Sequence, residues 1–356
     1  MDQQIKILGA GLSGLSAAIN LKLAGKDVDV YELRNSVGEQ IQPNFQLLHS
    51  REKSVSDYLK DLNLSPKFEY LEFSKAFFLT RKRDIEINLK RPLTFVCRGG
   101  NRSLEYGLYQ EALNLGVKFE FNTKISEKNV NIVATGPKGA DACGFGYVYE
   151  DLDFPRDHFL MMYDDRYSPR GWYFYIVPHL ENKFEVINCV CQPYTPLVKK
   201  LFSKAIEERK MIRDIVGNKK PVHSISGIGN VDIPRTAVIE NRFYLGESAG
   251  FQDPFRGFGM NFALESGKLA TEAIIKNLDY DKLWKQQFMD QFKLDFSRRL
   301  AISIFGDRLV EFLYRNVNSG DTMDFVKGDV SGTTGKVLKD LFFNLELFKH
   351  KLLGYW

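Results

Sequence analysis

A glycine-rich turn near the N-terminus constrains the fold of this chain more than any other feature. The sequence Gly9-Ala-Gly-Leu-Ser-Gly14 directly follows a β-rich run, Gln4–Leu8, and precedes apolar residues at helical spacing. A second β-rich run, Asp27–Tyr31, ends at Glu32, 18 residues after the last glycine. This order predicts a strand, a tight turn, a helix and a second strand, which is the first unit of a Rossmann-type α/β fold.

Each part of this unit suits a dinucleotide. Gly9 permits the tight turn, Gly11 lets the backbone approach a pyrophosphate, and Gly14 lets the helix pack closely on the strand. The helix N-terminus then faces the phosphates, and Glu32 accepts hydrogen bonds from a ribose. The pattern therefore predicts dinucleotide binding, against the alternative of a glycine-rich turn without a ligand. It does not by itself distinguish FAD from NAD.

The second half of the predicted nucleotide site lies far along the chain. A buried strand ends at Ala134-Thr-Gly136, and the segment 242–250 reads as another strand with a small-residue turn. The carboxylate of Glu247 suits the polyol chain of a flavin. The segment Gly257–Asn261 would bring backbone N–H groups and a helix N-terminus to the pyrimidine end of the ring, where they would stabilise the reduced form.

These segments together resemble the geranylgeranyl-reductase family of FAD-dependent oxidoreductases, within the p-hydroxybenzoate-hydroxylase-like flavoproteins. The resemblance rests on the N-terminal motif and on Gly246-Glu-Ser-Ala-Gly250, Asp253-Pro254 and Ala263-Leu-Glu-Ser-Gly267. It implies FAD as the cofactor. The residues assigned to the cofactor are Gly9, Ala10, Gly11, Leu12, Ser13, Gly14, Glu32, Leu33, Arg34, Arg98, Ala134, Thr135, Gly136, Gly246, Glu247, Pro254, Gly257, Phe258, Gly259, Met260 and Asn261.

Three residues depart from the family pattern. Glu247 stands where the family has Asp, Thr135 precedes Gly136 where many relatives have an Asp-Gly pair, and Tyr175 stands where a Trp is usual. Arg98 is the counterpart of an arginine that in relatives helps to hold the adenosine half of the flavin, and a solvated loop arginine is the alternative interpretation.

The predicted fold class is α/β, or α+β overall. It comprises a discontinuous Rossmann-type FAD-binding domain (1–66, 92–140 and 222–280), a β-sheet substrate domain (67–91 and 141–221) and a C-terminal helical region (281–356). In the substrate domain, strands are expected at 68–73, 76–80, 85–89, 172–177 and 184–191, and one helix at 199–216.

Tyr173 and Tyr175 are the candidate catalytic residues, as part of the substrate cavity. Strand alternation places them on one face and Trp172, Phe174 and Ile176 on the other. The resemblance implies that such a sheet roofs the flavin, so an aromatic face there would line the cavity. The alternative is that both faces are ordinary core.

Composition excludes several other classes of protein. Lys+Arg 49 against Asp+Glu 45 gives a net charge of +4, which does not favour nucleic-acid binding. Four cysteines make no disulfide framework, and Cys189 and Cys191 are expected to be buried neutral thiols rather than metal ligands. No run of 18 apolar residues exists, so no transmembrane helix is expected. The apolar segment Ile7–Ile19 reads as a strand and turn before a helix rather than as a signal peptide, so a cytoplasmic location is expected. A C-terminal apolar stripe (Leu338, Leu341, Phe342, Leu345, Phe348) is compatible with helix packing or with peripheral membrane contact.

The predicted activity is reduction of carbon–carbon double bonds in an isoprenoid, geranylgeranyl-type, or other apolar substrate by reduced FAD, a step of lipid biosynthesis. The alternative is an FAD-dependent monooxygenase of an aromatic or apolar small molecule, because Gly259-Met260-Asn261 also resembles the turn of aromatic hydroxylases. A flavin-binding module without turnover is a third alternative. The electron donor, NAD(P)H or ferredoxin, stays open, as do the proton donor and the oligomeric state.

Overall fold

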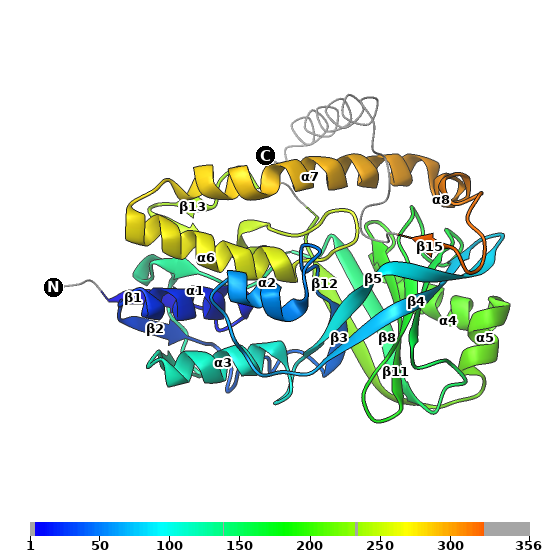
Figure 1. The fold of residues 1–356 in the computed structure, drawn as a ribbon, viewed down its shortest axis with the longest axis horizontal. Helices are drawn as coiled ribbons and strands as arrows, with labels where there is room; N and C mark the ends of the chain where they lie inside the picture. The colour runs from blue at the N-terminus through cyan, green and yellow to red at the C-terminus, as the bar shows by residue number, and fades with distance from the viewer. Residues whose placement is uncertain (1–3, 138, 232–233, 324–356) are drawn as a thin grey trace. The chain divides into compact units, whose positions relative to one another are not determined.

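In the computed structural model, which describes residues 4–137, 139–231 and 234–323, the chain forms two compact units (Figure 1). The first comprises Met1–Leu71, Thr94–Gly139 and Asn230–Phe292, and the second comprises Glu72–Leu93, Ala140–Gly229 and Lys293–Trp356. The region predicted to be separate, 281–356, is divided between the two units at Phe292. Its apolar stripe, Leu338 to Phe348, lies outside the described residues.

The first unit is built around a six-stranded sheet. Its strand order is β13-β14-β7-β1-β2-β6, and all neighbours are parallel except the β13–β14 hairpin. The buried, β-branched residues of the central strands explain this arrangement, because parallel strands are covered on both faces. The bounds are β1 (Ile5–Leu8), β2 (Val28–Tyr31), β6 (Lys118–Glu120), β7 (Ile132–Val133), β13 (Val238–Ile239) and β14 (Arg242–Tyr244).

Among the described residues, four α-helices lie entirely within the first unit: α1 (Leu12–Leu23), α2 (Val55–Asp61), α3 (Leu104–Asn114) and α6 (Met260–Lys276). Helix α1 contacts both α6 and α3 (Figure 1). Its contact with α6 is close because Gly267 has no side chain: a Cβ there would lie 2.7 Å from the backbone nitrogen of Ala17. This contact joins the N-terminal motif to the segment that follows residue 242, as a discontinuous Rossmann-type domain requires.

The second unit contains most of a nine-stranded sheet with the order β12-β8-β11-β10-β9-β4-β5-β15. The strand β3 (Asn44–Leu47) pairs with the end of β5 that belongs to the first unit. The predicted strands 68–73 and 76–80 are one continuous strand, and 85–89 is part of a longer one. The remaining bounds are β4 (Tyr70–Thr80), β5 (Asp84–Arg98), β8 (Ala142–Glu150), β9 (His158–Tyr163), β10 (Phe174–Pro178), β11 (Lys183–Cys191), β12 (Pro221–Gly229) and β15 (Thr322–Met323).

Helices α4 (Val198–Glu208) and α5 (Lys210–Val216) cover one face of this sheet. The single helix predicted for 199–216 is interrupted, because Arg209 adopts an extended backbone conformation with ψ of 107°. Phe202 of α4 packs on Phe145 and Phe174 from the sheet. The long helix α7 (Tyr280–Phe305) contributes residues to both units, and α8 (Asp307–Leu313) follows it in the second.

Candidate cofactor site

The first and last glycines of the N-terminal turn are required by the fold itself. Gly9 has a φ of +103°, and a Cβ built on it would lie 2.4 Å from the carbonyl oxygen of Ala134. A Cβ on Gly14 would lie 2.1 Å from the carbonyl oxygen of Gly9. No real Cβ tolerates such distances, so the turn closes tightly against the end of β7, where Ala134 is followed by Thr135 and Gly136.

The middle glycine of the turn has a different environment. Gly11 has a φ of −82°, which any residue adopts, and a Cβ there would find its nearest neighbour 4.0 Å away. Helix α1 starts at Leu12 with no side-chain cap from any described residue and no acidic residue in its first turn. The first N–H groups of α1, including those of Leu12 and Ser13, have no acceptor within the helix and lie at the positive end of its dipole. This is the form of a phosphate cradle.

The carboxylate of Glu32 is fixed next to this turn. Its Oε2 accepts a hydrogen bond from the N–H of Ala10 at 2.8 Å, and its Oε1 accepts one from the N–H of Arg34 at 2.9 Å. The intervening Leu33 is exposed. Each carboxylate oxygen has capacity for a further hydrogen bond, so the geometry suits the ribose contact predicted for Glu32.

A turn from the second half of the chain lies against the start of α1. Gly246 has a φ of +54°, and its N–H donates to the Oγ of Ser266 at 3.0 Å. A Cβ built on Gly246 would lie 3.1 Å from the Oγ of Ser13, which is a tight contact. The fold thus brings the Gly246–Ala249 turn to the N-terminal motif, although the two are far apart in the sequence.

Glu247, in this turn, carries a half-buried carboxyl group. Burial raises its pKa to about 7, and the nearby Arg98 opposes the shift. Among the described residues, none donates a hydrogen bond to this carboxyl group, and Arg98 is the charged group that acts on it. A partly desolvated acceptor of this kind is stabilised by a ligand that supplies a hydrogen-bond donor.

Arg98 is not a solvated loop arginine, so that alternative is wrong. It is the last residue of β5, and its side chain is 14% exposed. Its Nε forms an ion pair with the buried Glu105, and an Nη donates to the Oε1 of Gln46 at 2.7 Å. The guanidinium is thereby fixed beside Glu247. Its predicted role toward the adenosine half of a flavin stays a prediction.

The segment 253–259 closes into a compact loop before α6. The Oδ1 of Asp253 accepts the N–H of Phe255 at 2.7 Å, and the N–H of Asp253 donates to the carbonyl oxygen of Phe258 at 3.0 Å. Gly257, with a φ of +79°, donates its N–H to the carbonyl oxygen of Asp253. Helix α6 then begins at Met260 after Gly259, without a side-chain cap from the described residues. The helix N-terminus therefore lies where the sequence predicts it, with Pro254 and Asn261 buried.

A cluster of charged and aromatic side chains beside this loop was missed by the sequence analysis. Arg51 forms a bidentate ion pair with Glu265 of α6, with both distances 2.9 Å. The hydroxyl of Tyr58 donates to the same carboxylate at 3.0 Å. His49 lies close to this cluster and to Arg256 of the loop. The sequence offered one indication of this cluster, the acidic Glu265 within Ala263-Leu-Glu-Ser-Gly267. It did not indicate which residues pair with this carboxylate.

Tyr173 and Tyr175 belong to the second unit. Their ring centroids are 6.0 Å apart, and Tyr163 lies 6.2 Å from Tyr173. Tyr175 packs with Val148, Ile187 and Ile225, whereas Phe174 packs on the face under α4. The predicted alternation is therefore confirmed for Tyr175 against Phe174 and Ile176, whereas Trp172 and Tyr173 precede β10 and their rings stack with centroids 6.1 Å apart. Burial holds the pKa of Tyr175 well above its usual range, so its hydroxyl stays protonated. The catalytic role of the pair stays a prediction.

The cysteines of the second unit are free thiols with raised pKa values. Burial raises the pKa of Cys189 to about 12, and it also raises those of Cys143 and Cys191. No group of three or more metal-ligating side chains occurs in the described part of the chain. The prediction of buried neutral thiols at Cys189 and Cys191 agrees with these shifts.

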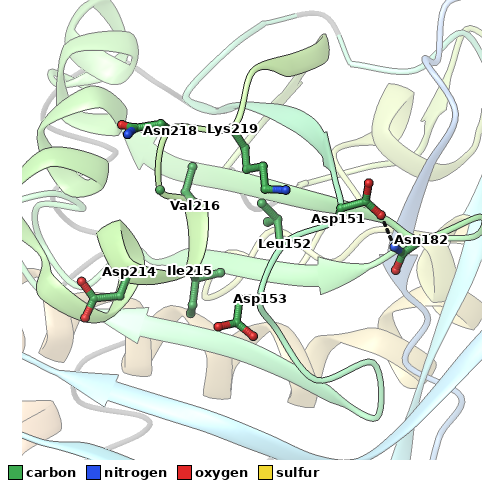
Figure 2. Close-up of a pocket in the computed structure, with 10 residues that line it drawn as sticks. Asp151, Leu152, Asp153, Asn182, Asp214, Ile215, Val216, Asn218 and Lys219 are labelled. Atoms are coloured by element: carbon green, nitrogen blue, oxygen red, sulfur yellow. Dashed lines mark hydrogen bonds between the residues drawn. The ribbon is translucent and has the colours of Figure 1, made fainter.

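A surface pocket in the second unit contains none of the predicted site residues (Figure 2). It has a volume of about 450 Å³ and is lined by Asp151, Asp153, Asp214, Lys219 and neighbouring residues. Figure 2 shows Asp151 hydrogen-bonded to Asn182 at its rim. Its acidic lining does not suit the apolar substrate predicted for this protein.

Comparisons with known proteins agree with this geometry. A family model described as an NAD(P)-binding Rossmann-like domain matches residues 7–51. An uncharacterized protein of Methanocaldococcus jannaschii is 24% identical over 305 residues, which cover 76% of each chain.

Two solved structures identify the fold. A geranylgeranyl bacteriochlorophyll reductase-like protein from Thermoplasma acidophilum matches with a TM-score of 0.75 at 16% identity, over 95% of this chain and 98% of its own. The flavin-dependent brominase Bmp2 matches with a TM-score of 0.64 at 14% identity, over 98% of this chain and 100% of its own. The chain has the fold of the flavin-dependent oxidoreductases.

This flavoprotein fold confirms the predicted combination of a discontinuous Rossmann-type domain with a second β-sheet unit. Reductase-like and halogenating relatives share it, so the fold leaves the substrate open. No helix of the described residues is long and apolar enough to cross a membrane.

Proposed function

We propose that this flavoprotein-fold chain is an FAD-dependent oxidoreductase of the geranylgeranyl-reductase type, which reduces carbon–carbon double bonds of an isoprenoid or another apolar substrate. The observation that carries the choice of FAD is Glu247. Its half-buried carboxyl group receives no hydrogen bond from the described residues. The polyol chain of a flavin supplies hydroxyl donors at such a place, and NAD has no polyol chain.

The remaining residues fit the same cofactor. The first turn of α1 and the open side of Gly11 would hold the pyrophosphate, and Glu32 would bind the ribose. The uncapped start of α6 would lie at the pyrimidine end of the ring. Bound FAD supplies reversible two-electron chemistry, and the chain supplies binding, orientation and electrostatics.

For the substrate, the proposal assigns Tyr173 and Tyr175 to an apolar cavity. The rings of Tyr163, Tyr173 and Tyr175 form an aromatic row, in which Tyr175 packs on the sheet face that does not pack against α4. They would orient an isoprenoid chain by contact rather than by proton transfer, because the raised pKa of Tyr175 makes its hydroxyl a poor acid. NAD(P)H or ferredoxin would supply the electrons. We place the protein in the cytoplasm, with peripheral membrane contact for a lipid substrate.

An FAD-dependent monooxygenase is the second candidate. The Gly259-Met260-Asn261 turn at the start of α6 favours it, because this turn resembles the corresponding turn of aromatic hydroxylases. The two candidates differ in whether oxygen is consumed.

The test is mass spectrometry of prenyl lipids and small aromatic compounds after incubation with the pre-reduced, FAD-loaded protein, with oxygen admitted to half the samples. A gain of two hydrogens in the anaerobic samples supports the reductase. A gain of one oxygen atom only in the aerated samples would replace it with the monooxygenase.

A third result concerns the cofactor alone. Flavin that binds, becomes reduced and reoxidises without changing any compound would indicate a binding module. The variant Glu247→Gln tests the cofactor contact, because it keeps the size of the side chain and removes its charge. If the carboxylate holds the polyol chain, this variant binds FAD more weakly. The protein that still contains FAD then forms the same product as the wild type.

A further inference from the structure

The end of helix α7 and the short helix α8 carry large apolar side chains that are exposed. Four of them are more than half exposed: Ile304 (61%), Phe305 (56%), Phe312 (60%) and Leu313 (52%). All four belong to the second unit, and only Gly306 separates the two helices. Exposed apolar side chains that are scattered singly are ordinary, whereas several in one short segment mark an interaction surface.

Helix α8 is anchored to the sheet by its opposite face. Asp307 and Val310 are buried, and the ring of Tyr314, directly after the helix, packs on Phe78 of β4 with centroids 4.6 Å apart. Arg83, in the loop between β4 and β5, donates to the carbonyl oxygen of Tyr314 at 2.8 Å. The orientation of α8 at this end of the second unit is therefore fixed by packing and hydrogen bonds (Figure 1).

Basic side chains accompany the apolar ones on the exposed face. Arg308, Phe312 and Arg315 are spaced four and three residues apart, which places them on one side of α8 and of the turn that continues it, and all three are exposed. The Cζ of Arg315 lies 4.7 Å from the centroid of the Phe312 ring. Arg81 and Lys82, in the adjacent loop between β4 and β5, are exposed as well. We call these four basic and four apolar residues the α7–α8 surface.

The two acidic residues of α8 do not neutralise the α7–α8 surface. Asp307 is buried, and the Oε1 of Glu311 accepts the N–H of Lys82 at 2.8 Å. An apolar and basic surface is complementary to a membrane with anionic headgroups. It is not complementary to a second copy of itself, which would bring like charges together. Nor is it complementary to residues 324–356, which carry five lysines and four acidic residues.

We propose that the α7–α8 surface docks this protein on an anionic membrane. The apolar side chains enter the boundary between headgroups and acyl chains, and the basic side chains bind the phosphate groups of the lipids. The inference rests on the proposed function for the lipid substrate that such a membrane supplies. It deepens that function by assigning its peripheral membrane contact to particular residues.

The test is co-sedimentation of the full chain with vesicles of phosphatidylcholine alone and of phosphatidylcholine mixed with phosphatidylglycerol, at low and high salt. We expect binding to the vesicles that contain phosphatidylglycerol, and we expect salt to weaken it. The double variant Arg308→Gln, Arg315→Gln removes two charges that contribute about fivefold each, so its binding should be weaker by about twenty-five-fold.

A second double variant, Phe312→Ser with Leu313→Ser, removes part of the apolar area and should weaken binding by about tenfold or more. Ile228→Ser is the matched control. Ile228 is 59% exposed and lies on β12, at the other end of the sheet from β4 and β5. We expect this control to bind like the wild type, with circular dichroism to check that every variant is folded.

Two results would overturn the inference on vesicles alone: a wild type that does not bind the anionic vesicles, and folded double variants that bind them as the wild type does. A third is a wild-type dimer in sedimentation velocity, without vesicles, that the Phe312→Ser, Leu313→Ser variant dissociates, because it assigns the surface to a second copy.

These outcomes are separable from those for the proposed function. Vesicle binding requires neither flavin nor turnover, so its failure leaves the proposed FAD-dependent reaction in place. A chain that binds the vesicles through the α7–α8 surface but binds no flavin would overturn the proposed cofactor and keep the docking surface.

Discussion

The N-terminal turn of the first unit and the aromatic row of the second unit differ in how clearly their residues indicate a function beyond packing. In the turn, Gly9 and Gly14 have no room for a Cβ, whereas Gly11 has room and an ordinary φ. Packing and backbone conformation thus explain two of the glycines and give no reason for the third. In the aromatic row, Tyr173 is buried and Tyr175 is half-buried, and both pack against other rings as ordinary core residues do. A motif residue that packing does not need indicates function more clearly than a buried aromatic does.

The largest expected effect that tests this comparison is the loss of flavin from Gly11→Glu. A carboxylate there would occupy the cradle at the start of α1 and repel a pyrophosphate, so we expect affinity for FAD to fall by about a thousandfold or more, which is about 4 kcal/mol. The measurement is flavin content after purification, with circular dichroism to check folding. Gly227→Glu, at an exposed glycine with open space, is the control for an added carboxylate. A folded Gly11→Glu protein that stays yellow would contradict the assignment of the turn.

The next effect separates Gly14 from Gly11 by stability. Gly14→Ala would place a Cβ 2.1 Å from the carbonyl oxygen of Gly9, and we expect the free energy of unfolding of the apoprotein to fall by about 3 kcal/mol. Gly11→Ala meets no atom closer than 4.0 Å, so we expect a change of less than about 1 kcal/mol. Urea denaturation of both variants measures the difference. Equal losses would remove the distinction between the two glycines.

A smaller effect concerns the pH dependence of the apoprotein through Glu247. Its pKa is raised to about 7 in the folded chain, above the 4.5 of an ordinary glutamate, so the folded state binds the proton more tightly than the unfolded state. Stability from this group is therefore greatest below about pH 4.5 and falls as the pH rises to about 7. After allowance for partial exposure, the change is about 2 kcal/mol.

Urea denaturation of the apoprotein at several pH values checks this prediction. In Glu247→Gln the contribution should disappear, while other titrating groups keep theirs. A variant with the same dependence as the wild type would show that the carboxyl group is not desolvated in the free protein.

The smallest expected effect addresses the aromatic row. Tyr175→Ala should lower substrate turnover about tenfold, or about 1.4 kcal/mol of transition-state stabilisation, with flavin content nearly unchanged. Phe174→Ala is the control, since this ring faces α4 on the other side of the same strand. We expect it to reduce stability by about 3 kcal/mol without changing turnover per folded molecule. If Tyr175→Ala loses flavin and turnover equally, both faces of the strand are structural.

The sequence alone determined the class of fold and the first half of the candidate site. Gly9, Gly14 and Glu32 were readable because the turn depends on interactions close in sequence and on backbone conformations that few residue types adopt. The start of α6 at Met260 followed from the same local signals, and so did the alternation of Tyr175 and Phe174 along β10.

Only the tertiary structure decided how the charged groups are paired. It fixed Arg98 between Glu105 and Glu247, tied Arg51 to Glu265, and placed His49 beside Arg256. These partners come from different elements, and a side chain's charge carries no information about which distant residue will neutralise it. The pKa of a carboxyl or imidazole group depends on burial and on those partners, so it arises only when the chain has folded.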